Sequence, residues 1–235
     1  KNVFFFACSL SLSLLSNKSQ SQTFFCSLFC SHINRRCLSL RNLMYFFFSF
    51  CALENMFSTW SSLNRRTGRF GVGRFEYLKL LLNEYEHSTT NNENKLQILA
   101  NLANFSYDPI NYPFIRQLNL IDLYLDCLQL HTDDDFVDYS LGALCNLSCD
   151  SLNCQDIFDK QPSILVLLVK CLFSHRFDIV MNSMLLLMFL SDFNSQMKKQ
   201  LIERHEIRSC LQQYSQSKDI RLANMSKLFL EDYFS

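Results

Sequence analysis

The stretch that decides the fold is "LANLANFSYDPIN" at residues 99–111, because most of its pattern returns as "GALCNLSCDSLN" at 142–153. In both copies a small apolar run leads to one Asn, then to an apolar residue and Ser, and then to Asp-x-x-Asn. Asn104 and Asn146 stand 42 positions apart. The chain therefore contains an internal repeat, and a repeat of this length determines the whole architecture.

The repeat continues toward the C-terminus. "FLSDFN" at 189–194 echoes the Asn-Leu-Ser-Cys-Asp part of the motif, and "LFLEDY" at 228–233 places Phe229 40 positions after Phe189. A period near 42 residues falls in the range of armadillo and HEAT repeats, which contain two or three helices per unit.

The apolar residues inside each unit recur at the helical period. Val137, Leu141 and Leu144 show the spacing of three and four, and no segment shows sustained alternation. The run "ILVLLV" at 164–169 resembles a buried strand by itself, but it aligns with the helical stretch 120–125, so we expect a helix there as well. The sequence thus predicts an all-α chain.

The pattern also predicts how the units follow one another. Helices over 74–86 and 93–106 form a truncated first unit, followed by three-helix units over 109–148, 151–191 and 194–234. Such units cannot bury their apolar faces alone and form one continuous core by stacking. We therefore predict an armadillo-type right-handed α-solenoid of about four repeats, folded as one domain over 74–235.

Residues at the predicted turns fit this map. Asp108 and Asp150 precede new helices, where a carboxylate can accept hydrogen bonds from exposed N–H groups. Pro109 fits the first helical position, which needs no N–H donor. Asn119 stands before a second helix, where Asn tolerates a left-handed backbone.

Residues 1–55 differ in composition from the rest. Phe, Ser, Leu and Cys fill 34 of these 55 positions, and five basic residues face one acidic residue. These amino acids have largely pyrimidine-rich codons, so we expect a disordered leader translated from an untranslated region, with Met56 as the true start. The alternative is a targeting segment, since the apolar run at 3–15 follows Lys1.

The charge distribution argues against a broad nucleic-acid surface. From residue 75 onward, 13 basic side chains face 21 acidic ones, a formal balance of −8. The exception is "RRTGRFGVGR" at 65–74, within a segment 56–73 that we expect to be a flexible arm. This arm either stays solvated or meets RNA or an acidic partner. Its candidate contact residues are Arg65, Arg66, Arg69 and Arg74.

Nothing in the repeat region predicts catalysis, a metal or a cofactor. Cys145, Cys149 and Cys154 have the wrong spacing for a zinc site, and no His lies near them. The histidines are scattered, without an obvious nucleophile beside any of them. We therefore expect a protein that is not an enzyme and that needs no cofactor.

The repeated Asn points to recognition of another protein. Asn104 and Asn146 lie on the predicted third helix of their units, facing the inner curve of the solenoid. An Asn amide offers two donors and an acceptor, so a row of them can pair with the main chain of an extended segment. Alternatively, each Asn bonds only a neighbouring helix end. Phe189 and Phe229 take the equivalent places in later units, either as apolar anchors for a partner or as core residues.

Three stretches carry a resemblance to the armadillo-repeat family, and within it to a small group of minor-spliceosome proteins. They are residues 100–128, "GALCNLS" at 142–148 and "LFLEDYFS" at 228–235. The resemblance spans about residues 73–235. It implies a non-enzymatic nuclear protein that partners an RNA-recognition-motif protein in splicing of the rare intron class. Contact with spliceosomal RNA would then be indirect, with no membrane or small-molecule substrate involved.

Other armadillo functions stay open. A karyopherin-like adaptor would bind an extended peptide in the same Asn-lined groove, but such adaptors need longer Asn rows with interleaved Trp. The single Trp of this chain, Trp60, lies outside the repeats. An adhesion or ubiquitin-ligase adaptor is a third class that the sequence leaves open.

Overall fold

The computed structural model describes residues 57–68, 71–87, 92–130 and 133–235. The predicted leader over 1–55 lies outside these residues, and so does Arg69 of the predicted arm. The described part is helical throughout and contains no strand. This confirms the predicted all-α class.

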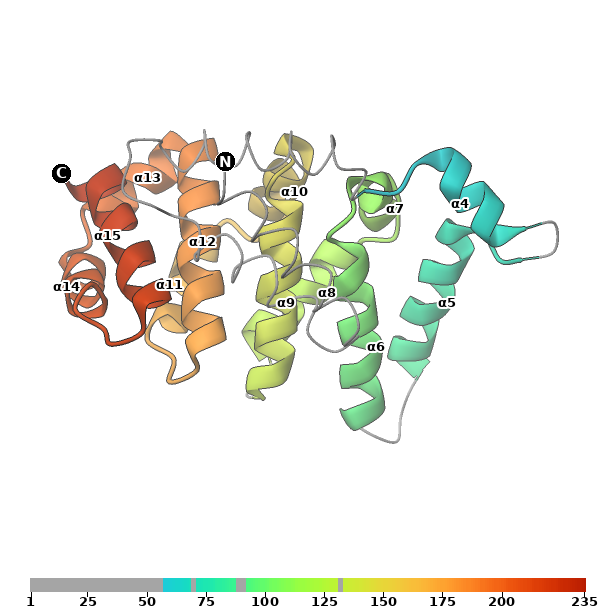
Figure 1. Ribbon diagram of the computed structural model, residues 1–235, viewed down its shortest axis with the longest axis horizontal. Helices are drawn as coiled ribbons and strands as arrows, with labels where there is room; N and C mark the ends of the chain where they lie inside the picture. Colours follow the sequence, from blue (N-terminus) through green and yellow to red (C-terminus); the bar gives the residue numbers. More distant parts are fainter. Residues whose placement is uncertain (1–56, 69–70, 88–91, 131–132) are drawn as a thin grey trace, which may run out of the picture.

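The helices follow the predicted units closely (Figure 1). Helix α4 precedes a truncated first repeat of α5 and α6, and three complete repeats follow. The elements are α4 (Trp60–Thr67), α5 (Arg74–His87), α6 (Asn92–Phe105), the 3₁₀ turn η1 (Pro109–Asn111), α7 (Tyr112–Gln117), α8 (Leu120–Leu130), α9 (Asp134–Leu147), α10 (Ser151–Lys160), α11 (Ile164–Leu172), α12 (Phe177–Phe193), α13 (Ser195–Ile202), α14 (His205–Tyr214) and α15 (Ile220–Phe234). The run at 164–169 is therefore helical, as expected.

The repeats stack so that equivalent helices form layers (Figure 1). The third helices of the repeats, α6, α9, α12 and α15, lie in a row, with α9 packed against both α6 and α12. Each third helix also packs against the second helix of its own repeat, namely α5, α8, α11 or α14. The short first helices α7, α10 and α13 lie along one edge of this two-layered rod.

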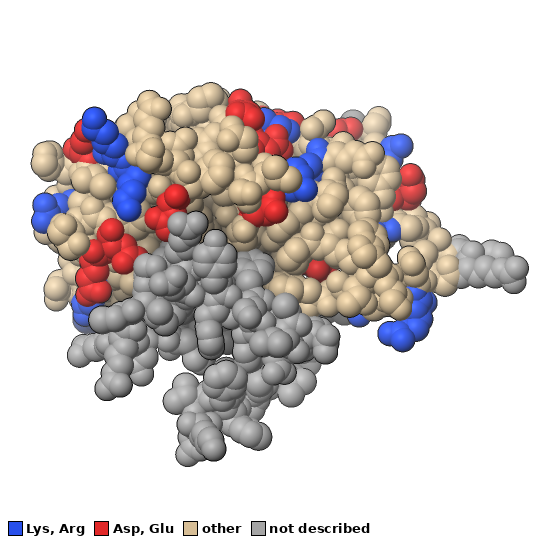
Figure 2. All heavy atoms as spheres, turned by 90° about the horizontal axis from the view of Figure 1, so that it is seen from above, with Lys and Arg blue, Asp and Glu red and all other residues tan. Residues whose placement is uncertain are grey.

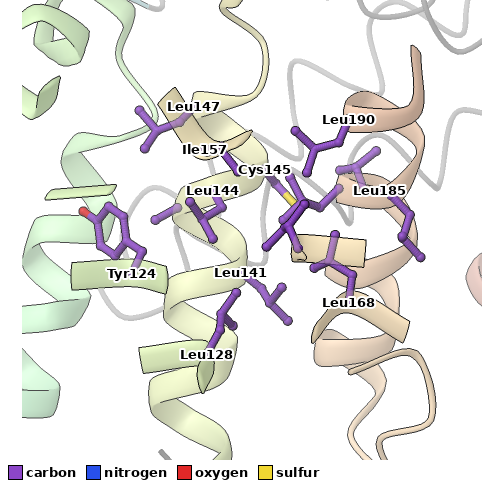
Figure 3. Close-up of a cluster of buried hydrophobic side chains, with 14 of the residues drawn as sticks. Tyr124, Leu128, Leu141, Leu144, Cys145, Leu147, Ile157, Leu168, Leu185 and Leu190 are labelled. Atoms are coloured by element: carbon purple, nitrogen blue, oxygen red, sulfur yellow. The ribbon is translucent and has the colours of Figure 1, made fainter. Parts of the chain in front are cut away.

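The core runs continuously through the repeats. Leu141 and Leu144 of α9 are fully buried, and Figure 3 shows them among side chains from α8, α11 and α12. In α12 every residue from 179 to 188 is buried, although Asn182 and Ser183 interrupt the apolar run. A helix that is apolar nearly all round is the one that its neighbours enclose most completely.

The Asp-x-x-Asn motif forms the joint between successive repeats. The Asp150 carboxylate accepts hydrogen bonds from the backbone N–H groups of Leu152 and Asn153, each at 3.1 Å, and so caps α10. The Asn153 amide donates to the Leu147 carbonyl at 2.9 Å, which satisfies the end of α9. One Asp thus starts a helix while one Asn closes the previous helix.

The same joint occurs one repeat earlier. Asp108 accepts from the backbone N–H of Ile110 at 3.3 Å, and the Asn111 amide donates to the Phe105 carbonyl at 2.8 Å. The predicted capping roles of Asp108 and Asp150 are confirmed. Pro109 opens η1, as its position predicted.

Asn119 confirms a second turn prediction. It is the one residue other than Gly with positive φ in the described part of the chain, and its φ of 54° lies in the left-handed region. It separates α7 from α8. Lys160 of the next repeat donates to the Asn119 side chain at 3.4 Å and to Asp122 at 2.8 Å, so this turn also meets its neighbour.

Side-chain hydrogen bonds tie each repeat to the next at a spacing close to the sequence period. The Tyr214 hydroxyl donates to the Leu172 carbonyl at 2.9 Å, and the Tyr85 hydroxyl lies 3.6 Å from the Cys127 sulfur. Each pair is 42 residues apart in sequence. Contacts of this range are expected of a solenoid whose units touch only their neighbours.

The segment 56–73 differs from the flexible arm that we expected, because α4 occupies part of it. Thr59 and Ser62 form a reciprocal capping box at its start: the Thr59 side chain accepts from the Ser62 N–H at 3.2 Å, and the Thr59 N–H donates to the Ser62 hydroxyl at 3.1 Å. Gly68, with φ of 66°, ends the helix. The Trp60 ring meets the Phe114 ring edge-on at 5.8 Å, so α4 is packed against α7.

Candidate protein-binding surface

The two Asn residues that suggested a binding row occupy different environments. Asn104, near the C-terminal end of α6, is exposed. Asn146, at the equivalent place of α9, is only 5% exposed, and its backbone carbonyl accepts a hydrogen bond from the Tyr112 hydroxyl at 2.8 Å. Asn104 is therefore the more exposed of the two residues.

The two phenylalanines of the predicted row also differ. Phe229 of α15 is fully buried, and its ring packs edge-on against Tyr233 with centroids 5.0 Å apart. It lies in the core, the second of its two expected roles, and offers no surface to a partner in this conformation. Phe189 of α12 is half-buried among residues packed on the core.

The candidate arginines divide into surface and packed residues. Arg65 and Arg66 of α4 are exposed. Arg74, at the start of α5, is half-buried with its guanidinium 4.7 Å from the centre of the Phe105 ring. Burial lowers the pKa of Arg74, and the negative charge of Asp108 opposes that shift. Arg74 thus contributes to the packing between α5 and the end of α6.

A polar cluster that the sequence did not suggest lies between the third helices α9 and α12. The Asn182 amide donates to the Asp138 carboxylate at 3.0 Å, across a separation of 44 residues. Arg176 pairs with Asp138 at 3.5 Å and also with Asp135. The sequence feature that could have indicated this cluster is Asn182, a polar residue within the apolar run of α12.

Burial controls the ionisation of this cluster. Asp138 is only 7% exposed, and burial, followed by the negative charge of Asp178, raises its pKa to about 6. Arg176 and the hydrogen bond from Asn182 act in the opposite direction. The charged carboxylate is thus held in an unfavourable place at neutral pH, and its partners offset only part of the cost.

This arrangement predicts a pH-dependent effect of Asp138→Asn. Between about pH 4 and pH 6 the folded chain holds a proton on Asp138 that the unfolded chain releases, so the stability from this group is lost as pH rises through about 6. The variant keeps an acceptor for Asn182 without the charge. We expect it to be more stable than the parent at pH 8 by about 1–3 kcal/mol, with a smaller difference at pH 5.

Urea unfolding at the two pH values measures this difference. Asp135→Asn is the matched control, since it removes the other carboxylate that pairs with Arg176 but sits at a more exposed position. We expect that control to change the pH dependence much less than Asp138→Asn does, because the charge of Asp135 has the smallest effect on the pKa of Asp138. A less stable Asp138→Asn protein at pH 8 would show that the ion pair with Arg176 outweighs the cost of burial.

The described residues show neither an activated thiol nor a cluster that could hold a metal ion. Burial raises the pKa of Cys154 to about 12 and holds the pKa values of Cys145 and Cys149 well above their usual range, so their thiols stay protonated. No group of three His, Cys, Asp or Glu residues within the described ranges could hold a metal ion. None of the described helices has both the length and the apolar character needed to cross a bilayer.

Comparison with known proteins supports the fold. A computationally designed armadillo-repeat protein for modular peptide recognition superimposes with a TM-score of 0.54 at 15% identity, covering 68% of this chain and 70% of the design. An engineered protein solved by a structural genomics consortium also gives a TM-score of 0.54, at 19% identity, covering 67% of this chain but only 38% of that one. No family model matches the sequence.

The stacked three-helix units, their joints and these superpositions define an armadillo-repeat protein, an α-solenoid scaffold suited to binding other proteins. Within this class, mouse armadillo repeat-containing protein 7 is 37% identical over 164 residues, which cover 70% of this chain and 80% of the mouse protein. The chain belongs to the armadillo repeat-containing protein 7 family.

Proposed function

We propose that this chain is a non-catalytic scaffold that binds a protein carrying an RNA-recognition motif and acts with it in the nucleus, in the minor spliceosome. The observation that carries the proposal is the solenoid itself, a stack of helical repeats of the armadillo class, which is suited to binding other proteins. The particular partner and process rest on the family resemblance of the three stretches named above.

The charge balance supports an indirect contact with RNA. The repeats carry 13 basic against 21 acidic side chains from residue 75 onward. A protein that binds nucleic acid broadly needs clustered Lys and Arg to displace counterions. A partner protein would therefore supply the RNA-binding surface, while this chain supplies the scaffold.

The test is purification of the tagged full chain from nuclear extract, followed by mass spectrometry. We expect an RNA-recognition-motif protein together with minor-spliceosome components. The matched control is the same chain with Leu144→Ala, a core change that should disturb the scaffold. Recovery of transport receptors without splicing factors would instead favour the karyopherin-like adaptor.

The exposed position of Asn104 gives a more local prediction. Asn104→Ala should weaken affinity for the captured partner about three- to tenfold, the range of one lost hydrogen bond, and should leave the melting temperature within about two degrees. Asn94→Ala, an exposed Asn near the other end of α6, is the control. For Asn146, burial leads us to expect a fall in melting temperature as well.

Calorimetric titration of purified partner and thermal unfolding give the two readouts. Unchanged affinity in Asn104→Ala, with the partner still captured by the parent chain, would remove Asn104 from the binding surface. It would leave the scaffold function itself intact.

A further inference from the structure

The N-terminal end of the solenoid exposes large apolar side chains together with arginines. We call this surface the α4–α5 patch, and it consists of Trp60, Arg65, Arg66, Val72, Tyr77 and Leu80. Trp60 is 56% exposed and Leu80 is equally so. The end of a repeat array normally presents a polar outer face, so the composition of this end calls for a binding partner.

A hollow in the patch brings two guanidinium groups together. It measures about 160 Å³, and its lining residues are Leu63, Arg66, Thr67, Val72, Arg74 and Tyr77. Burial has the largest effect on the pKa of Arg74 and lowers it; the negative charge of Asp108 opposes this shift, and the positive charge of Arg66 lowers the pKa further, so the two cations repel each other. A carboxylate placed in the hollow would offset both charges and could accept hydrogen bonds from both groups.

Contacts with the neighbouring helices hold the segments that carry the hollow in place. The backbone N–H of Ser58 donates to the Asp108 carboxylate at 3.0 Å, and the Trp60 ring packs on Phe114. On the other side, the Tyr77 ring meets the Phe105 ring at 5.8 Å. The surface is thus built before a ligand arrives, which reduces the entropy cost of binding.

The exposed arginines of α4 can pair with the charge of a ligand. Neither Arg65 nor Arg66 forms an ion pair with a residue that the structure describes. Figure 2 shows a group of basic side chains at the end of the molecule that carries α4, while acidic and basic side chains both occur elsewhere on that face. The patch is therefore a local basic surface on an acidic scaffold.

We propose that the α4–α5 patch binds an acidic segment of a protein partner, with carboxylates in the hollow at Arg66 and Arg74 and apolar side chains of the segment on the exposed apolar residues of the patch. Trp, Tyr and Arg are the residues most enriched at the energetic centres of protein interfaces. Single-stranded RNA is the rival ligand, because bases could stack on the rings of Trp60 and Tyr77, but the acidic balance of the adjoining repeats disfavours an extended phosphate backbone. This surface is separate from the row of third helices and does not depend on the identity of the spliceosomal partner.

Trp60 provides the measurement because it is the single tryptophan of the chain. The probe is a short synthetic peptide in which Asp and Glu flank a central Phe-Leu pair, titrated into the full chain. We expect a saturable blue shift of tryptophan emission as the exposed ring is covered. The same peptide with Lys in place of Asp and Glu should cause no saturable change.

Arg66→Glu should lower the affinity for the acidic peptide about tenfold or more, because it reverses the charge at the hollow. Arg208→Glu, an exposed arginine of α14 near the other end of the rod, should change affinity less than about twofold. Circular dichroism melts of both variants check that the fold is retained. Equal loss in both variants, or no shift with the acidic peptide, would overturn the proposal.

Titration with an oligouridylate distinguishes binding of RNA from binding of an acidic peptide. Quenching of Trp60 by this RNA that Arg66→Glu abolishes, with no response to the acidic peptide, would replace the proposal by an RNA site. Capture of splicing proteins by the Arg66→Glu chain is scored separately, so failure here leaves the proposed scaffold function standing.

Discussion

Phe229→Ala is expected to lower the free energy of unfolding by about 3–5 kcal/mol. The side chain is fully buried in the last repeat and packs against the rings of Tyr233 and Phe234. Alanine would leave a cavity that α15 cannot fill, because its Tyr233 hydroxyl is bonded to the Met188 carbonyl at 2.9 Å. Urea unfolding monitored by circular dichroism measures the loss.

The position of Phe229 predicts where the loss appears. Because units of a solenoid are stabilised by their immediate neighbours, amide exchange should accelerate mainly in α13, α14 and α15. Phe193→Ala is the matched control: Phe193 is 38% exposed and stacks on Phe158 with centroids 6.0 Å apart, so we expect a cost near 1 kcal/mol, about that of one aromatic pair. A stable Phe229→Ala protein that no longer captures its partner would return Phe229 to the binding surface.

Leu144→Ala is expected to lower the free energy of unfolding by about 2–5 kcal/mol. Leu144 is fully buried in the last turn of α9, between the helices of its own repeat and those of the next (Figure 3). The lost methyl groups are surrounded on several sides, so the neighbours can close only part of the cavity. The same urea unfolding experiment measures the change.

Because α9 lies between α6 and α12, the loss of stability should reach both of these helices. Amide exchange is therefore expected to accelerate in α6 and α12 as well as in α9, unlike the local effect at Phe229. Leu152→Ala is the control, because Leu152 is largely exposed at the start of α10 and such surface changes usually stay within about 0.5 kcal/mol. A Leu144→Ala protein as stable as this control would show that the cavity collapses.

The repeat allowed much of the fold to be predicted. Aligned copies identified the helix at 164–169, which its own composition left ambiguous between helix and strand. Local turn chemistry then placed Asp108, Asp150 and Asn119, because these residues interact mainly with their own backbone. Features of this kind are encoded within a few residues and do not depend on distant packing.

The candidate site was harder to predict, because the exposure of a side chain depends on the helices packed beside it. Asn104 and Asn146 share one motif, yet α9 has a third helix on each side while α6 has one on only one side. The interior copy, Asn146, is buried and the end copy, Asn104, is exposed, a difference that the motif does not contain. Helix α4 was missed because the Arg and Gly residues in its last turn and after it suggested a flexible segment, although Thr59 and Ser62 form a capping box.

The Asp-x-x-Asn joint makes the length of this molecule adjustable. The stretch from Asp108 to Asp150 begins and ends with the same junction, so an in-frame copy of it would find a compatible neighbour at either boundary. Duplication or excision at these junctions changes the span of the rod without requiring a new kind of interface. Recombination can therefore lengthen or shorten such a chain in whole units.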